Sequence, residues 1–135
     1  MTLNELYDIA EKDDIIIIND KLTQCPSLSI MDGNDCTIVI DYSKINSNSL
    51  HKVYIAHELG HCETGAFYNA YNYLDLCCRC EYKADKWAIK KLLPQEDVIT
   101  ALEKGYTEVW QLAEYFDVTE DLVKKAIWIY FDKQV

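Results

Sequence analysis

The sequence has little proline and little glycine. Only 2 prolines and 4 glycines occur among its 135 residues, and no stretch rich in proline, glycine or serine interrupts the chain. Repeats and low-complexity tracts are absent as well, so nothing marks a domain boundary. A chain of this length, with 50% apolar residues, can bury a core without cross-links. We therefore expect a single domain over residues 1–135.

Positive charge is also scarce. The chain carries 13 lysine and arginine residues against 23 aspartate and glutamate residues, which gives a formal net charge of -10 at pH 7. Binding to a nucleic-acid backbone requires a concentrated positive surface. The composition therefore argues against nucleic acid as the main partner, and we expect a protein or peptide instead.

Long apolar runs are missing. The run of isoleucines at residues 15–18 is far too short to cross a bilayer. Residues 1–14 carry acidic side chains where a signal peptide has a basic start and a continuous apolar segment. We expect a cytoplasmic protein without membrane contact. In that compartment most cysteines are reduced thiols that pack in the core or bind metal, and we expect this of Cys25, Cys36, Cys62, Cys77, Cys78 and Cys80.

The spacing of apolar residues predicts an α+β fold. A small N-terminal β-sheet is followed by one long helix, a second long helix and a C-terminal helical segment. The turn-forming residues at 32–35 indicate a hairpin. The strands are expected at 15–18 (buried), 28–31 and 37–40. The helices are expected at 3–10, from Ser47 or Ser49 to near Gly65, from Asp75 as N-cap to Pro94, and at 95–104, 107–116 and 120–131.

Residues 57–61 read His-Glu-Leu-Gly-His, an HExxH motif on the first long helix. Residues four apart share one face of a helix, so His57 and His61 can bind one metal ion. Glu58 would stand beside that ion without binding it. The alternative is that both histidines merely lie on the surface of an amphipathic helix.

A catalytic zinc site needs three protein ligands and one open position for water. The remaining histidine, His51, precedes the motif by six residues and is turned away from it. Glu81 lies in the second long helix, and an antiparallel return of the chain would bring it against the motif. Asp85, one turn later, could accept the outer N–H of His57. The alternative is that Glu81 and Asp85 only pair with lysines on a solvated face.

Two segments resemble a known family. The sequences AHELGHC at 56–62 and EYKADKWAIKKLLP at 81–94 are similar to those of the ImmA/IrrE-type metallopeptidases, small cytoplasmic gluzincin-like enzymes often encoded with prophages, conjugative elements or stress regulators. The resemblance implies a zincin-like fold, with zinc bound by His57, His61 and Glu81 and with Glu58 as the catalytic carboxylate. Family members are thought to cleave a helix-turn-helix repressor, so the resemblance also implies a protein substrate of that type.

These parts predict hydrolysis of a peptide bond. Zinc lowers the pKa of its bound water to about 7 and polarises the scissile carbonyl. Glu58 is expected to take the water proton and to deliver it later to the leaving amine.

Substrate contacts are expected at two places. The strand at 37–41 precedes the motif helix, and we expect it to be an edge strand that pairs with an extended substrate through Thr37 and Val39. A developing oxyanion needs a hydrogen-bond donor. The tyrosines between the two long helices could supply it, although such residues more often pack or lie at the surface; they are Tyr68, Tyr71 and Tyr73.

Cysteines lie beside both motifs, so a thiolate zinc site has to be weighed. Cys62 follows His61 directly, and Cys77, Cys78 and Cys80 lie within one turn of Glu81. Adjacent residues of a helix point in different directions and cannot both reach one tetrahedral ion. Buried reduced thiols are therefore favoured. A narrower alternative is that Cys77 or Cys78 approaches the open metal position and makes the activity redox-sensitive.

Residues 107–131 have the outline of a helix-turn-helix. The second of these helices opens with two acidic residues, offers only two lysines and ends in apolar residues, which disfavours contact with a phosphate backbone. We expect these helices to pack on the core, without direct nucleic acid binding. The tryptophans expected in that core are Trp87, Trp110 and Trp128.

Two classes of function remain. One is a zinc-dependent endopeptidase that cleaves a specific intracellular protein, and the other is a non-catalytic metal-binding module that binds a regulator. Glu58 favours the enzyme, because a metal-binding scaffold does not need a general base.

Overall fold

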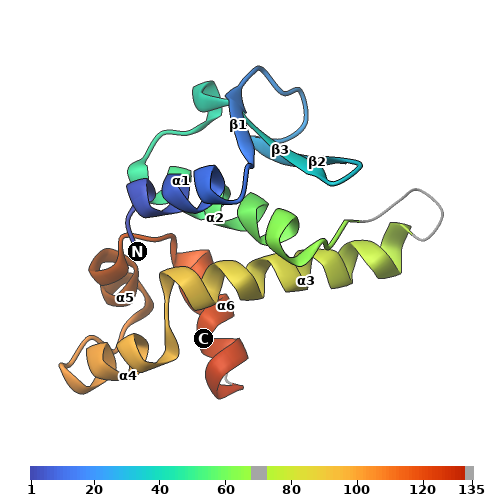
Figure 1. Ribbon diagram of the computed structural model, residues 1–135. Coiled ribbons are helices and arrows are strands. Elements are labelled where there is room, and N and C mark those ends of the chain that lie inside the picture. Colours follow the sequence, from blue (N-terminus) through green and yellow to red (C-terminus); the bar gives the residue numbers. More distant parts are fainter. Residues whose placement is uncertain (68–72, 133–135) are drawn as a thin grey trace.

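The computed structural model describes residues 1–67 and 73–132, and it has the predicted α+β architecture (Figure 1). A small sheet near the N-terminus lies against the long helices, and three shorter helices follow. The elements are α1 (Leu3–Lys12), β1 (Ile16–Asn19), β2 (Ser27–Asp32), β3 (Asp35–Ile40), the 3-10 turn η1 (Tyr42–Lys44), α2 (Asn48–Thr64), α3 (Tyr73–Leu92), α4 (Gln95–Glu103), α5 (Val109–Phe116) and α6 (Glu120–Phe131).

The sheet has the strand order β1-β3-β2. β3 pairs in parallel with β1 and antiparallel with β2. Gly33, in the loop of the β2–β3 hairpin, has φ 63°, a left-handed conformation that glycine adopts readily. The prediction that residues 37–41 form an edge strand is wrong, because residues 37–40 are paired on both sides. The edge nearest the HExxH helix belongs to β2 instead.

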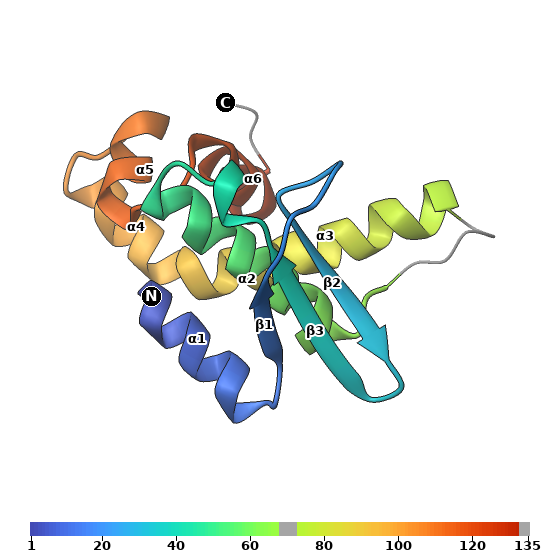
Figure 2. The same cartoon turned by 90° about the horizontal axis from the view of Figure 1, so that it is seen from above.

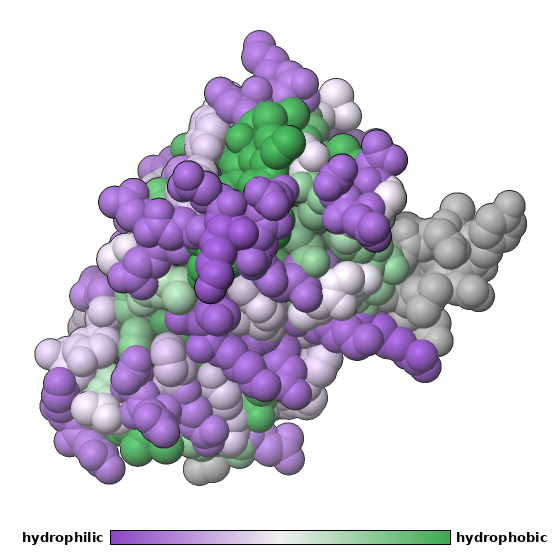
Figure 3. Space-filling model, viewed as in Figure 1, coloured by the Kyte–Doolittle hydropathy of each residue, from purple (hydrophilic) through white to green (hydrophobic). Residues whose placement is uncertain are grey.

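Strand β1 forms close to its predicted position, but it is not the buried strand that its β-branched residues suggested. The side chain of Ile16 is 60% exposed and that of Ile18 is 43% exposed. The buried residues Ile38 and Ile40 of β3 show that the helices cover the other face of the sheet. Figure 3 shows a hydrophobic patch near the top of the molecule, over β1, with hydrophilic residues around it.

Helix α2 is the central element of the fold. Ser47 begins it by accepting a hydrogen bond from the backbone N–H of Leu50 at 3.1 Å, and Gly65 ends it with φ 66°, as the sequence predicted. Ile55 and Leu59 are completely buried. The helix packs against the sheet on one side and against α3 on the other (Figures 1 and 2).

Helices α2 and α3 run antiparallel (Figure 1), and they approach closely at Gly60. A Cβ atom at Gly60 would lie 2.5 Å from the carbonyl oxygen of Ala84, so only glycine allows this approach. The chain thus returns past the motif as predicted. Asp75 is not the N-cap of the second long helix, because α3 already begins at Tyr73.

Helices α5 and α6 pack on the α2–α3 pair, as expected for residues 107–131. The buried ammonium group of Lys52 donates to the carbonyl oxygen of Phe116 at 2.9 Å and so joins α2 to α5, while α6 lies against α3. Two of the predicted core tryptophans lie at the surface instead, since Trp110 is 53% exposed and Trp128 is 47% exposed. None of the described helices is both long enough and apolar enough to span a membrane.

Candidate metal centre

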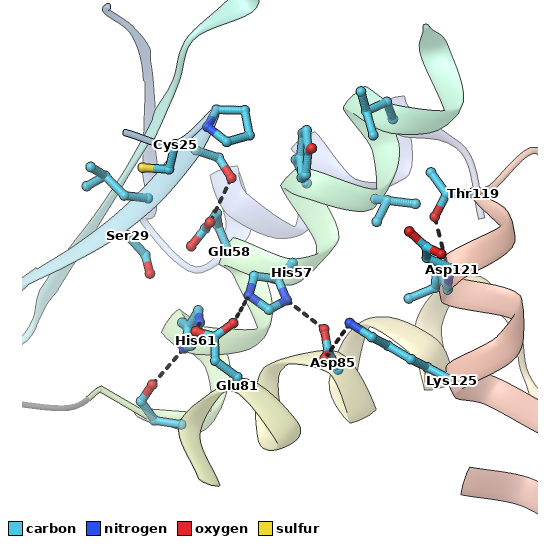
Figure 4. Close-up of a pocket in the computed structure, with 18 of the residues that line it drawn as sticks. Cys25, Ser29, His57, Glu58, His61, Glu81, Asp85, Thr119, Asp121 and Lys125 are labelled. Carbon is cyan, nitrogen blue, oxygen red and sulfur yellow. Dashed lines mark hydrogen bonds and ion pairs between the residues drawn. The ribbon is translucent and has the colours of Figure 1, made fainter. Parts of the chain in front are cut away.

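Three side chains of the two long helices converge on one point (Figure 4). His57 and His61 lie one turn apart on α2, and Glu81 faces them from α3. The carboxylate oxygens of Glu81 lie 2.8 Å from Nε2 of His57 and 2.9 Å from Nε2 of His61. One ligand atom from each of the three residues lies within 4.8 Å of the other two. The predicted trio is therefore brought together.

The outer ring nitrogens of both histidines are held by acceptors. Nδ1 of His57 donates to the carboxylate of Asp85 at 2.8 Å, the contact that the spacing on α3 predicted. Nδ1 of His61 donates to the carbonyl oxygen of Ala66 at 2.7 Å. These bonds orient both rings so that Nε2 faces Glu81, which is how protein metal sites usually hold their histidines.

The protonation states of His57 and Glu81 follow from the contacts of their side chains. Burial alone would lower the pKa of His57, but hydrogen bonds to Asp85 and Glu81 outweigh burial and raise that pKa to about 10. The same two histidines hold the pKa of Glu81 well below its usual range. Glu81 is therefore ionised at neutral pH, and His57 carries a proton that a bound metal would displace.

The pKa values of His61 and Asp85 also reflect a competition between burial and hydrogen bonding. Burial opposes the charge on His61, but its bonds to Glu81 and to the carbonyl of Ala66 raise its pKa. Burial likewise disfavours the charge on Asp85, but the bond from His57 and the ammonium of Lys125 lower its pKa. Lys125 reaches Asp85 from α6 at 3.1 Å. Asp85 thus has the lysine partner considered as an alternative in the sequence, but it bonds to His57 as well, and the sequence did not identify Lys125.

Glu58 lies beside the trio without joining it. Its side chain is 5% exposed, and one carboxylate oxygen accepts a hydrogen bond from the hydroxyl of Ser27 at 2.8 Å (Figure 4). Ser27 is the first residue of β2, so the edge strand holds the carboxylate in place. No motif pointed to Ser27, because its position depends on the register of the hairpin.

These residues line a cavity of about 630 Å³. The edge of the sheet forms one wall through residues 25–29, α2 and α3 form the floor, and the start of α6 forms the opposite wall. The α6 wall was not predicted; it consists of Thr119, Asp121, Leu122 and Lys125.

Of the two predicted sets of substrate contacts, the structure contradicts one and does not describe the other. Thr37 and Val39 do not line the cavity, because they lie in the central strand and not at the edge. Tyr68 and Tyr71 lie outside the described residues, so their predicted role stays a prediction. His51 was not expected to bind metal. Its Nε2 atom lies 3.1 Å from the hydroxyl oxygen of Tyr7.

The cysteines depart from the expected reduced state at one pair. Cys36 of β3 and Cys62 of α2 form a disulfide, with 5.9 Å between their Cα atoms. The sequence could not reveal this pair, because the register of the sheet over α2 brings the two residues together. Cys62 is therefore not available as a metal ligand. Cys80 is buried, Cys25 lines the cavity, and the side chains of Cys77 and Cys78 fall outside the described part of the structure.

The donor set fits a divalent metal ion. Two imidazole nitrogens and one carboxylate oxygen form the combination found in catalytic zinc sites, where three protein ligands leave a position open for water. Glu81 already aligns its two oxygens with the two Nε2 atoms, and the cavity gives access to that point.

Comparison with known proteins supports this assignment. A family model described as Peptidase_M78, IrrE N-terminal-like domain, matches residues 29–127. The match includes both helices that carry the trio, the β2–β3 hairpin for most of its length and the greater part of α6. Neither the curated proteins nor the solved structures contain a significant match to the chain.

Proposed function

Because this chain belongs to the IrrE N-terminal-like family of peptidases, we propose that it is a zinc-dependent endopeptidase. The family suggests a metallopeptidase-type function. The observation that carries the proposal is the joint presence of a group that could hold a metal ion, His57, His61 and Glu81, and a buried carboxylate beside it, Glu58. A site that only binds metal has no use for that carboxylate.

The trio would hold the metal. A zinc ion there supplies a Lewis acid that polarises a carbonyl group and lowers the pKa of water. Asp85 and the carbonyl of Ala66 keep the two imidazole rings oriented toward the site. Their role is to fix the geometry before substrate arrives.

Glu58 would move the proton. Its carboxylate accepts a proton from the attacking water and returns it to the amine nitrogen of the leaving group, so that water and peptide become a carboxylic acid and an amine. The bond from Ser27 orients this carboxylate, and its low exposure keeps bulk water away from it.

Strand β2 is the place where an extended substrate would pair. It is an edge strand, and residues 25–29, which lead into it and form its first half, line the cavity beside Glu58. Main-chain pairing with a sheet edge holds a peptide extended and gives affinity without strong sequence preference. This role replaces the one that the sequence suggested for residues 37–41.

The substrate that we propose is an intracellular protein, in particular a helix-turn-helix repressor of a prophage, mobile element or stress response. Two features support it. The sequence resembles a family with such substrates, and the net charge of -10 suits a basic partner such as a DNA-binding protein.

The test compares the zinc-loaded protein with its Glu58→Gln variant on proteins extracted from the host cell, with new N-termini identified by mass spectrometry. Glutamine keeps the size of the side chain but cannot accept the proton, so cleavage should fall by about 10²-fold or more while zinc content and melting temperature stay the same. Glu103→Gln, at an exposed position of α4, is the matched control and should cleave like the wild type. Equal cleavage by Glu58→Gln would exclude Glu58 as the base, and no cleavage by the wild type would favour a binding module.

A further inference from the structure

The face of the sheet that points away from the helices is apolar. The register places Ile16 of β1 and Ile30 of β2 on either side of Thr37 of β3, and places Ile18 beside Val39 in the next row. Alternate residues of a strand share one face, so these side chains lie together. We call Ile16, Ile18 and Ile30 the isoleucine face.

Three isoleucines of this face are open to solvent, although Val39, beside Ile18 on the same face, is only 7% exposed. Ile16, Ile18 and Ile30 are 60%, 43% and 50% exposed. Figure 2 views the sheet from above, and none of the described helices covers it in that view. Monomeric proteins rarely expose contiguous apolar patches larger than a few hundred Å², and a large apolar patch with a polar border is typical of a protein-binding surface. The isoleucine face thus has the character of an interface.

Acidic residues lie at one end of the face. β1 and β3 run in parallel, so their N-terminal ends lie at the same side of the sheet. Asp14 precedes β1 by two positions, and Asp32 pairs with Asp35 at the β2–β3 turn. All three aspartates are exposed. A partner that covers the isoleucine face would meet a negative border at this end.

The negative charge of the chain also distinguishes between two kinds of partner for this face, a second copy of the chain and a different protein. A second copy of this chain would bring another net charge of -10 against the first, which opposes association. A partner with lysine or arginine beside an apolar surface would gain attraction from the same aspartates. Charge complementarity therefore favours a different, basic protein.

We propose that the isoleucine face is a docking surface for a partner protein whose contacting surface is apolar and carries lysine or arginine at one end. The face lies on the side of the sheet away from α2, while the cavity lies between the β2 edge, α2, α3 and α6. The face and the cavity meet at Leu28, which pairs with Val39 and also lines the cavity, whereas Ile16, Ile18 and Ile30 do not line it. Binding at the isoleucine face can be tested without any cleavage assay.

The test uses a fluorescent amphipathic helical peptide with leucine on one face and lysine on its border, with a glutamate version as its counterpart. The full-length protein should bind the lysine peptide and not the glutamate peptide in an anisotropy titration. The double variant Ile16→Thr and Ile30→Thr should weaken binding by about tenfold or more, because two apolar contacts are lost. Ile99→Thr, which changes an isoleucine that is 39% exposed on α4, should bind like the wild type.

A second variant tests the charges. Asp14→Asn with Asp35→Asn should weaken binding at low salt and reduce its dependence on salt, because fewer opposite charges face the peptide. Asparagine tolerates the positive φ of 56° at Asp14, so the fold should persist, and circular dichroism would verify this for every variant.

Failure of the wild type to bind the lysine peptide, or equal binding by the Ile16/Ile30 variant, would overturn the proposal. A wild-type dimer that the same variant dissociates in sedimentation velocity would also overturn it and make a second copy the occupant.

Discussion

Each histidine of the trio points one ring nitrogen, Nε2, at the site because the other ring nitrogen is held elsewhere. His57 depends on a side chain for this, Asp85, whereas His61 depends on the backbone carbonyl of Ala66. Asp85 is further held by Lys125, whose own side chain is 55% exposed. An ion pair with an exposed lysine contributes little by itself. The contact that matters for the site is therefore the one between Asp85 and His57.

Asp85→Asn should reduce zinc affinity by about 10- to 100-fold, since the imidazole loses its anionic partner. Isothermal titration calorimetry of the metal-free protein measures this directly. Asp121→Asn is the matched control, because Asp121 also lines the cavity but is not one of the three residues that could hold the metal. If Asp85→Asn and the wild type bind zinc equally, Asp85 does not support the metal site.

The sequence revealed the side chains whose positions follow from helix geometry. His57, Glu58 and His61 share one helix, and Glu81 and Asp85 lie one turn apart on another, so spacing together with the expected antiparallel return of the chain indicated that they would meet. Ser27 and the carbonyl of Ala66 could not be predicted in this way. The first depends on how the hairpin sits over α2, and the second depends on the path of the chain after Gly65.

Among the elements, α2 and α3 come into close contact at Gly60. Gly60 lies inside the HExxH motif, and the backbone of Ala84 lies directly against it. Glycine is normally unfavourable inside a helix by about 1 kcal/mol relative to alanine. Its presence at this position is explained by the space that α3 occupies.

Gly60→Ala should therefore destabilise the protein by about 1–3 kcal/mol despite the better helix propensity of alanine, because the added methyl group overlaps the backbone of α3. Urea unfolding of the metal-free protein measures this loss, and zinc affinity should fall with it as Glu81 is pushed away. Gly60→Ser adds a larger side chain and should destabilise further. An alanine variant as stable as the wild type would show that the helices can separate without cost.

The helices were predicted better than the sheet. Helix ends carry local signals such as Ser47 and Gly65, and the structure confirms both. The order of strands has no local signal, because a run such as residues 37–40 is equally apolar in the middle of a sheet and at its edge. The lack of a local signal also explains why β1 was predicted to be buried. Its β-branched residues predicted a strand correctly, but they could not show that one of its faces is open.

For the molecule as a whole, charge and shape give opposite indications about DNA. The pair α5 and α6 has the outline of a helix-turn-helix, yet α6 begins with Glu120 and Asp121 and forms a wall of the cavity. We predict no specific binding to duplex DNA at physiological ionic strength, because the net charge of -10 repels the phosphate backbone. An electrophoretic mobility-shift assay measures this, and a sequence-selective, salt-dependent shift would contradict it.

The account as a whole depends on one metal ion bound between the two long helices. Zinc titration of the metal-free protein by calorimetry tests this most directly, with Glu81→Ala beside Glu103→Ala as the matched change at an exposed position of α4. Wild type, Glu103→Ala and Glu58→Gln should each bind about one zinc ion per chain with similar affinity, and Glu81→Ala should bind far more weakly, as expected for the loss of one of three ligands. Full zinc binding by Glu81→Ala, or no zinc binding by the wild type, would contradict the account.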